Sequence, residues 1–132
     1  MYTVKYTERF EDWYVAEGDI FHYENINSAC KGFEQVTRGL LSNSKAIEGL
    51  CLYIEDYHSE DEDIDSYAIG IIISLEKDDE QIASLDLVFD PRSKTLKFEN
   101  SLMIEYENLS AVEEDQLDEL CNKFWWLVKR EY

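Results

Sequence analysis

Closely spaced carboxylates are the first residues in this sequence whose types and spacing point to chemistry. The segment DEDID at 61–65 places carboxylates at alternate positions, as a calcium-binding loop does. An EF-hand that began at Asp61 would need Gly at its sixth position and a bidentate Glu at its twelfth. The chain has Ser66 and Ile72 at these positions, so the sequence does not predict a calcium site.

Other catalytic and cofactor signatures are also missing from the sequence. The two histidines, His22 and His58, lie in no motif, the G-x-S-x-G pattern of a nucleophile elbow does not occur, and the five glycines are isolated. The cysteines include no closely spaced pair that could supply half of a zinc site. We predict that Cys30, Cys51 and Cys121 are reduced and lie in the core, and that the protein is cytoplasmic. We therefore expect no enzyme, no cofactor and no metal site.

The charge of the chain is its strongest signal. Among 132 residues, 30 are Asp or Glu and 12 are Lys or Arg, which gives a net charge of -18. Such a surface repels nucleic acids and anionic membranes, because binding to either needs clustered Lys and Arg. The hydrophobic content of 45% nevertheless predicts a folded chain, and the length predicts a single domain over residues 1–132. We expect a basic protein partner, bound by a monomer or weak dimer.

Three stretches without Lys or Arg hold many of the acids, namely 10–30, 46–76 and 98–122. Carboxylates replace phosphates as partners of Arg and Lys, and their field accelerates association with a cationic protein. We predict a partner-binding face made of Glu55, Asp56, Tyr57, Glu60, Asp61, Glu62, Asp63 and Asp65, extended by Asp12 and Asp19. The alternative that stays open is a solvated loop that keeps the protein soluble.

We also predict that Trp126 belongs to this partner-binding face. It lies two residues beyond Phe124 on the last predicted helix, so it projects away from the apolar face, among polar and basic residues. Exposed Trp is a common anchor of protein interfaces. The alternative is that another layer of the protein covers its ring.

Alternating apolar residues predict the strands of the fold. We expect strands at 1–7, 50–57, 67–76, 82–89, 94–99 and 102–107, with 67–76 in a central position because both its faces are apolar. A charged turn at 77–81 and a type I turn at 90–93, with Pro91 as its second residue, join neighbouring strands. The segment 8–23 is compatible with a short helical turn or with a second strand around Gly18 and Asp19.

The first predicted helix runs over 28–41, with Asn27 as its N-cap. Gly32 and Gly39 lie beside its apolar face, although Gly disfavours a helix by about 1 kcal/mol relative to Ala. Either the close approach of another backbone explains both glycines, or they are tolerated flaws.

The last predicted helix begins at a capping box, Ser110-Ala111-Val112-Glu113. Its apolar face consists of Leu117, Leu120, Cys121, Phe124, Leu127 and Val128. The whole pattern predicts an α+β fold, in which two α-helices pack on one face of an antiparallel β-meander of four to five strands.

A small, acidic, single-domain α+β protein without a catalytic motif resembles the immunity proteins that neutralise bacterial nuclease toxins, and the nuclease inhibitors and nucleic-acid mimics of phages and plasmids. The resemblance covers the whole chain in size and charge profile and includes no diagnostic motif. It implies a tight complex with one cationic toxin domain, in which the acidic face fills the site for nucleic acid. Two other classes stay open, namely an adaptor or secretion chaperone that binds through an apolar surface, and adaptation to high salt.

Overall fold

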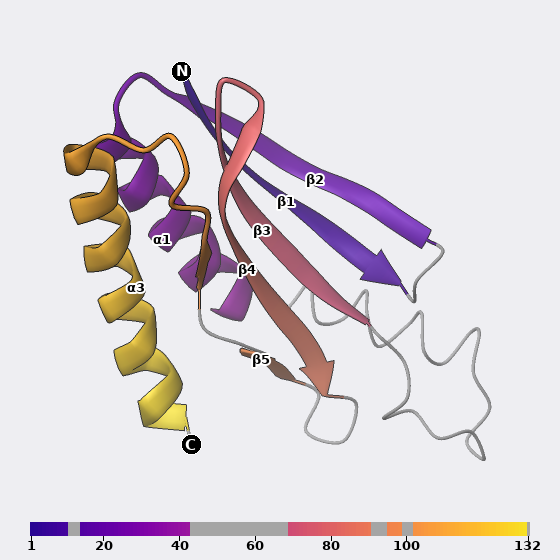
Figure 1. Cartoon of the computed structure of the whole chain (residues 1–132). Helices are drawn as coiled ribbons and strands as arrows, with labels where there is room; N and C mark the ends of the chain where they lie inside the picture. Colours follow the sequence, from indigo (N-terminus) through magenta and orange to yellow (C-terminus); the bar gives the residue numbers. More distant parts are fainter. Residues whose placement is uncertain (11–13, 43–68, 91–94, 99–101, 132) are drawn as a thin grey trace, which may run out of the picture.

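The computed structural model describes residues 1–10, 14–42, 69–90, 95–98 and 102–131. Within them, an antiparallel sheet packs against two helices on one face, which confirms the predicted α+β fold (Figure 1). The strands are β1 (Tyr2–Phe10), β2 (Tyr14–Tyr23), β3 (Ile69–Lys77), β4 (Glu80–Asp90), β5 (Thr95–Phe98) and β6 (Met103–Ile104). The helices are α1 (Ile26–Ser42) and α3 (Ala111–Glu131).

The strands follow the order β2-β1-β3-β4-β5, with β6 paired to β4. The central position predicted for 67–76 is confirmed, because β3 lies between β1 and β4. The strand predicted at 102–107 is shorter, since β6 is two residues long and the chain then turns toward α3. The predicted strand at 50–57 and the turn at Pro91 lie outside the described residues.

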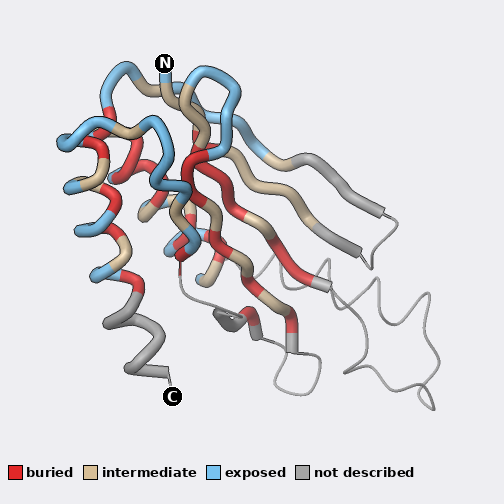
Figure 2. Tube along the Cα trace, viewed as in Figure 1, coloured by how far each residue is buried: buried red, intermediate tan, exposed pale blue. Residues whose placement is uncertain are grey.

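The core fills the space between the sheet and the two helices (Figure 2). Alternate positions of β3 and β4 face this core, with buried side chains at Ile71, Ile73, Leu75, Ala83, Leu85, Leu87 and Phe89. The helices meet them with apolar residues at helical spacing, and the rings of Phe33 and Phe124 pack edge to face, with their centroids 5.8 Å apart. Among the described residues, no helix combines the length and the apolar composition needed to cross a membrane.

Two strands contain bulges that change which side chains face inward. In β2, Gly18 and Asp19 together lie opposite the single residue Tyr6, because the pairing shifts from Lys5↔Ile20 to Thr7↔Glu17. In β4, Ile82 is the extra residue, and both it and Ala83 are buried. A bulge places two consecutive residues where a regular strand has one, so it bends the strand and breaks its alternation.

Helix α1 begins two residues earlier than the sequence predicted, at Ile26. The backbone N–H of Ser28 donates a hydrogen bond of 2.8 Å to the Asn25 side-chain oxygen, so Asn25 is the N-cap and the prediction of Asn27 was wrong. Both Asn residues suit a cap, and the buried Ile26 decides between them because it belongs to the helix and to the core.

The two glycines of α1 have different explanations. A side chain at Gly32 would overlap the ring of Tyr23, so this glycine makes room for a side chain, and neither of the two proposed explanations applies to it. A Cβ at Gly39 would have no atom within 4 Å, so this glycine is a tolerated flaw.

Among the cysteines of the described residues, Cys30 is free and buried, as predicted, and Cys121 is free and half-buried. Burial raises the pKa of the Cys30 thiol to about 11, which makes it a poor nucleophile at neutral pH. Cys51 lies outside the described residues.

Candidate functional site

Most of the predicted partner-binding residues lie outside the described part of the chain. This applies to Glu55, Asp56, Tyr57, Glu60, Asp61, Glu62, Asp63, Asp65 and Asp12. Trp126 belongs to α3, but its side chain is not described. Asp19 is exposed on β2 and accepts a hydrogen bond of 3.3 Å from the Tyr6 hydroxyl. The described residues therefore leave the predicted face a prediction, and the candidate site below comes from the structure.

The candidate site is an acidic end of the molecule, where the β3–β4 hairpin, the β6–α3 loop and the start of α3 meet (Figure 1). The hairpin turn consists of Asp78 and Asp79, with φ angles of 50° and 69°. These two left-handed residues form the two-residue hairpin turn that matches the twist of the strands, for which Asn and Gly are favoured. Asp78 is also a common residue at the first of these positions, whereas Asp79 stands where Gly is usual, and Glu80 adds a third carboxylate at the start of β4.

The β6–α3 loop brings further carboxylates to this hairpin. The backbone N–H of Glu105 donates a hydrogen bond of 2.9 Å to the carbonyl oxygen of Ile82, which fixes the loop against β4. Beyond it, Glu107 and Asn108 line a groove of about 290 Å³ together with Lys77, Asp78, Glu80 and Ile82. Carboxylates from two segments distant in the sequence therefore share one groove.

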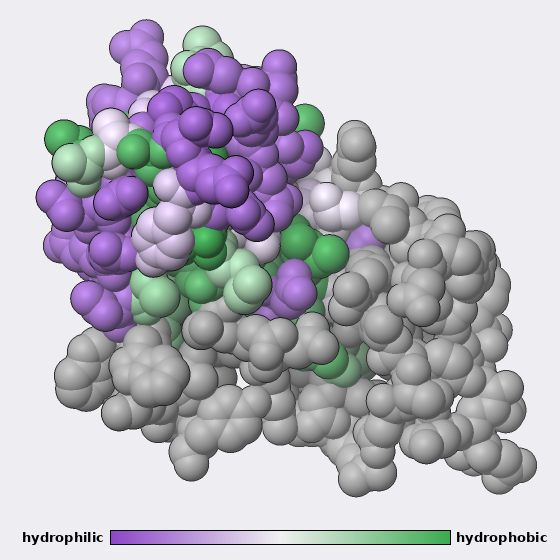
Figure 3. Space-filling model, viewed as in Figure 1, coloured by the Kyte–Doolittle hydropathy of each residue, from purple (hydrophilic) through white to green (hydrophobic). Residues whose placement is uncertain are grey.

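Hydrophilic side chains cover this end of the molecule in Figure 3. The first turns of α3 extend the acidic surface with Glu114, Asp115 and Asp118. The hydroxyl of Tyr106 donates a hydrogen bond of 2.9 Å to Asp118, and this bond is the main cause of the raised pKa of Tyr106.

Lys77 and the N-terminal ammonium, the cations at this end, form ion pairs within the protein. Lys77 Nζ lies 2.9 Å from Glu113 Oε1, and the N-terminal ammonium lies 3.0 Å from Asp78 Oδ1. No described residue forms an ion pair with the exposed carboxylates of Asp79, Glu80, Glu105 and Glu107. This end therefore presents an excess of negative charge to whatever approaches the groove.

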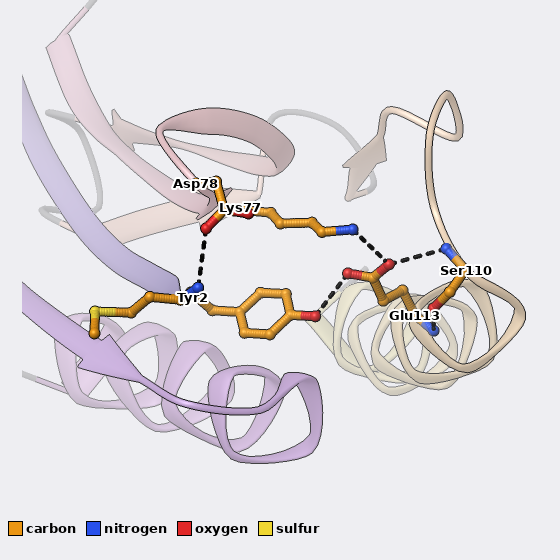
Figure 4. A network of polar contacts seen from close by, with 6 residues as sticks. Tyr2, Lys77, Asp78, Ser110 and Glu113 are labelled. Carbon is orange, nitrogen blue, oxygen red and sulfur yellow. Dashed lines mark hydrogen bonds and ion pairs between the residues drawn. The ribbon is translucent and has the colours of Figure 1, made fainter.

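Glu113 is the one buried carboxylate of this region, with 3% of its surface exposed. Its carboxylate accepts hydrogen bonds of 2.7 Å from the Tyr2 hydroxyl, 2.9 Å from Lys77 Nζ and 2.9 Å from the backbone N–H of Ser110. These three donors surround it in Figure 4. The N–H of Glu113 donates in turn to the Ser110 hydroxyl at 3.2 Å, which confirms the predicted capping box. Burial alone would raise the pKa of Glu113, but these bonds outweigh it and lower the pKa to about 2. Glu113 therefore stabilises the structure of the site, and its buried carboxylate is not accessible to a partner.

The described residues contain no group of three His, Cys, Asp or Glu side chains arranged to hold a metal ion. The exposed His22 has the Thr3 hydroxyl as its neighbour, with Thr3 Oγ1 3.2 Å from the imidazole Nδ1. The exposed carboxylates of the acidic end can accept hydrogen bonds from Arg and Lys side chains.

Sequence reasoning missed this site although its signals were present. The sequence predicts a charged turn at the acids of the hairpin, and Glu105 and Glu107 lie in the stretch 98–122, which has no Lys or Arg. Their meeting depends on the pairing of β6 with β4, which is a contact between segments about 20 residues apart and leaves no local pattern. Comparison with known proteins adds no family, since no family model, curated protein or solved structure matches the chain.

Proposed function

We propose that this protein is an acidic inhibitor, an immunity protein that binds a cationic nuclease toxin and covers its site for nucleic acid. The observation that carries the proposal is the acidic end, where exposed carboxylates gather around a groove while the neighbouring cations are engaged internally. Carboxylates in this arrangement accept paired hydrogen bonds from Arg, as phosphates do. The proposal assigns the protein no catalytic residue and no cofactor, and places it in the cytoplasm.

The net charge of -18 supports the same function through the rate of binding. A negative field steers a cationic partner and raises association toward 10⁸–10⁹ M⁻¹s⁻¹, from about 10⁵–10⁶ M⁻¹s⁻¹ for uncharged partners. Salt screens this attraction, so association with the toxin slows as ionic strength rises.

The test is an inhibition assay with a toxin nuclease domain, which is to be sought first in the neighbouring reading frame. The purified chain is expected to stop cleavage of nucleic acid at equal molar amounts, and an unaffected nuclease in excess chain would refute the proposal. The site is tested by reversing Glu80, Glu105 and Glu107 to Lys in one variant, and Glu60, Asp61, Glu62, Asp63 and Asp65 to Lys in another. The variant with the slower association identifies which acidic surface docks.

An adaptor or secretion chaperone is the second candidate function, favoured by the exposed apolar side chains of Ile20 and Phe21 on β2. Such a protein binds through apolar contacts, so its complexes resist salt, and it forms a dimer. Light scattering over a concentration series separates the candidates, because a monomer at all concentrations counts against the chaperone.

A further inference from the structure

Strand β2 forms a long edge of the sheet. Its one neighbour among the described strands is β1, and it spans ten residues (Figure 1). At the other side of the sheet, the edge consists of β5 and β6, which span four and two residues. A long edge presents unpaired N–H and C=O groups, and proteins commonly protect such edges with Lys, Pro, bulges or short strands.

The protection of β2 ends at its bulge. Gly18 and Asp19 form the bulge, and the exposed Asp19 adds a carboxylate there. Beyond it, 20–23 pairs regularly with 2–5 of β1 and contains neither Pro nor Lys, Arg, Asp or Glu. This segment is therefore a regular strand edge that lacks the Pro, charged side chains and bulges that usually protect such an edge.

Apolar side chains of this segment are exposed on both faces of the sheet. Ile20 is 52% exposed and Phe21 is 39% exposed. Successive side chains of a strand point to opposite faces, so Ile20 lies on the face of Lys5, and Phe21 lies on the face of Val4. A strand added at this edge would cover apolar surface on both faces while pairing its backbone with β2.

The charges around this edge favour a basic strand as its binding partner. Exposed carboxylates flank the segment at Asp19 and Glu24. A second copy of this chain would bring the same carboxylates and a further charge of -18 to the contact. A basic strand would instead meet opposite charges at both ends of the segment.

We propose that residues 20–23 of β2 pair with an extended basic segment of the partner protein, which adds a strand to the sheet. This mode of recognition takes its affinity from backbone hydrogen bonds and its specificity from alternate side chains. The inference rests on the proposed function, because it states how the cationic partner is held beside the acidic end.

The probe for this edge is a peptide of alternating Lys and Val, about eight residues long, a usual strand length. The full isotope-labelled chain is titrated with it, and backbone amide exchange is followed by NMR. We expect slower exchange at the amides of 20–23 that point away from β1, and no change with a peptide of alternating Glu and Val. The I20K variant should weaken binding about tenfold, because it loses an apolar contact and repels the Lys side chains.

Val112→Lys is the matched control, because Val112 is 63% exposed on α3 and its replacement adds the same charge. Equal weakening by I20K and V112K would overturn the inference, as would peptide binding that perturbs Glu80 and Glu107 and leaves 20–23 unchanged. Dimers of the chain that I20K dissociates would overturn it in favour of a second copy. The proposed function is judged separately, because full nuclease inhibition by I20K overturns the edge pairing alone, whereas no inhibition by the unaltered chain overturns the function.

Discussion

The hydroxyl of Tyr2 on β1 donates a hydrogen bond of 2.7 Å to the carboxylate of Glu113 on α3, 111 residues away in the chain. Lys77 lies opposite Tyr2 in the pairing of β1 with β3, and it binds the same carboxylate. Glu113 also closes the capping box with Ser110. One side chain therefore caps α3 and joins it to two strands, and the helix and the sheet depend on each other at the acidic end.

Replacing Glu113 with Gln is expected to lower the free energy of unfolding by about 2–3 kcal/mol, because it leaves Lys77 without its buried counterion and weakens charge-assisted bonds. Urea unfolding monitored by circular dichroism measures the change. Asp115→Asn is the control, since it removes an exposed charge from the same helical turn and should change stability by less than about 0.5 kcal/mol. Similar losses in both variants would contradict the role of the buried network.

The pH dependence of stability should report Glu113 directly. Its pKa falls from 4.5 to about 2 in the folded protein, so folding favours the charged form. The resulting stabilisation is complete above pH 4.5 and is lost as the pH falls toward 2. The difference in unfolding free energy between the unaltered chain and E113Q should therefore shrink across this window, and a constant difference would contradict the assignment.

The glycines of α1 provide a matched pair of substitutions. Gly32→Ala is expected to destabilise the protein by about 1–2 kcal/mol, because the new Cβ forces the ring of Tyr23 to move. Gly39→Ala enters open space and should stabilise the protein by up to about 1 kcal/mol through helix propensity. Thermal unfolding measures the stability of the two variants. If both substitutions changed the stability in the same direction, the packing of the Tyr23 ring would not require Gly32.

The hairpin turn predicts a stabilising substitution at Asp79. This residue has a φ of 69°, which glycine adopts without strain, so D79G should raise the free energy of unfolding by about 0.5 kcal/mol after the entropy of the unfolded chain is included. Glu80→Gly removes the same charge at a strand position and should destabilise instead, by about 0.5–1 kcal/mol. If both variants were stabilised equally, the cause would be relief of charge repulsion rather than backbone conformation.

The fold follows from the sequence where the pattern is local. The capping box at Ser110 and the central position of β3 were predicted correctly, because each is encoded by residues that are close together in the sequence. The choice of Asn27 over Asn25 failed because two equivalent caps flank Ile26, and only the packing of Ile26 decides between them.

The sequence did not distinguish a strand from a short helical turn at β2, and the reason is physical. The bulge at Gly18 and Asp19 shifts the pairing of β2 with β1 by one residue, because two residues of β2 lie opposite Tyr6. A pattern with a period of two cannot continue through such a change. The acidic end escaped prediction for another reason, since Glu105 and Glu107 reach the hairpin through a bond to Ile82 that no local pattern encodes.

The ring of Tyr23 lies against Gly32 where β2 turns into α1, and Asn25 caps the helix two residues later. The end of β2 is thereby tied to a helix that packs in the core. A strand held in this way has already lost its backbone freedom during folding, so it loses little more when another strand pairs with it. The contact of one aromatic ring with one glycine thus preorganises the edge for binding and lowers the entropy cost of any complex formed there.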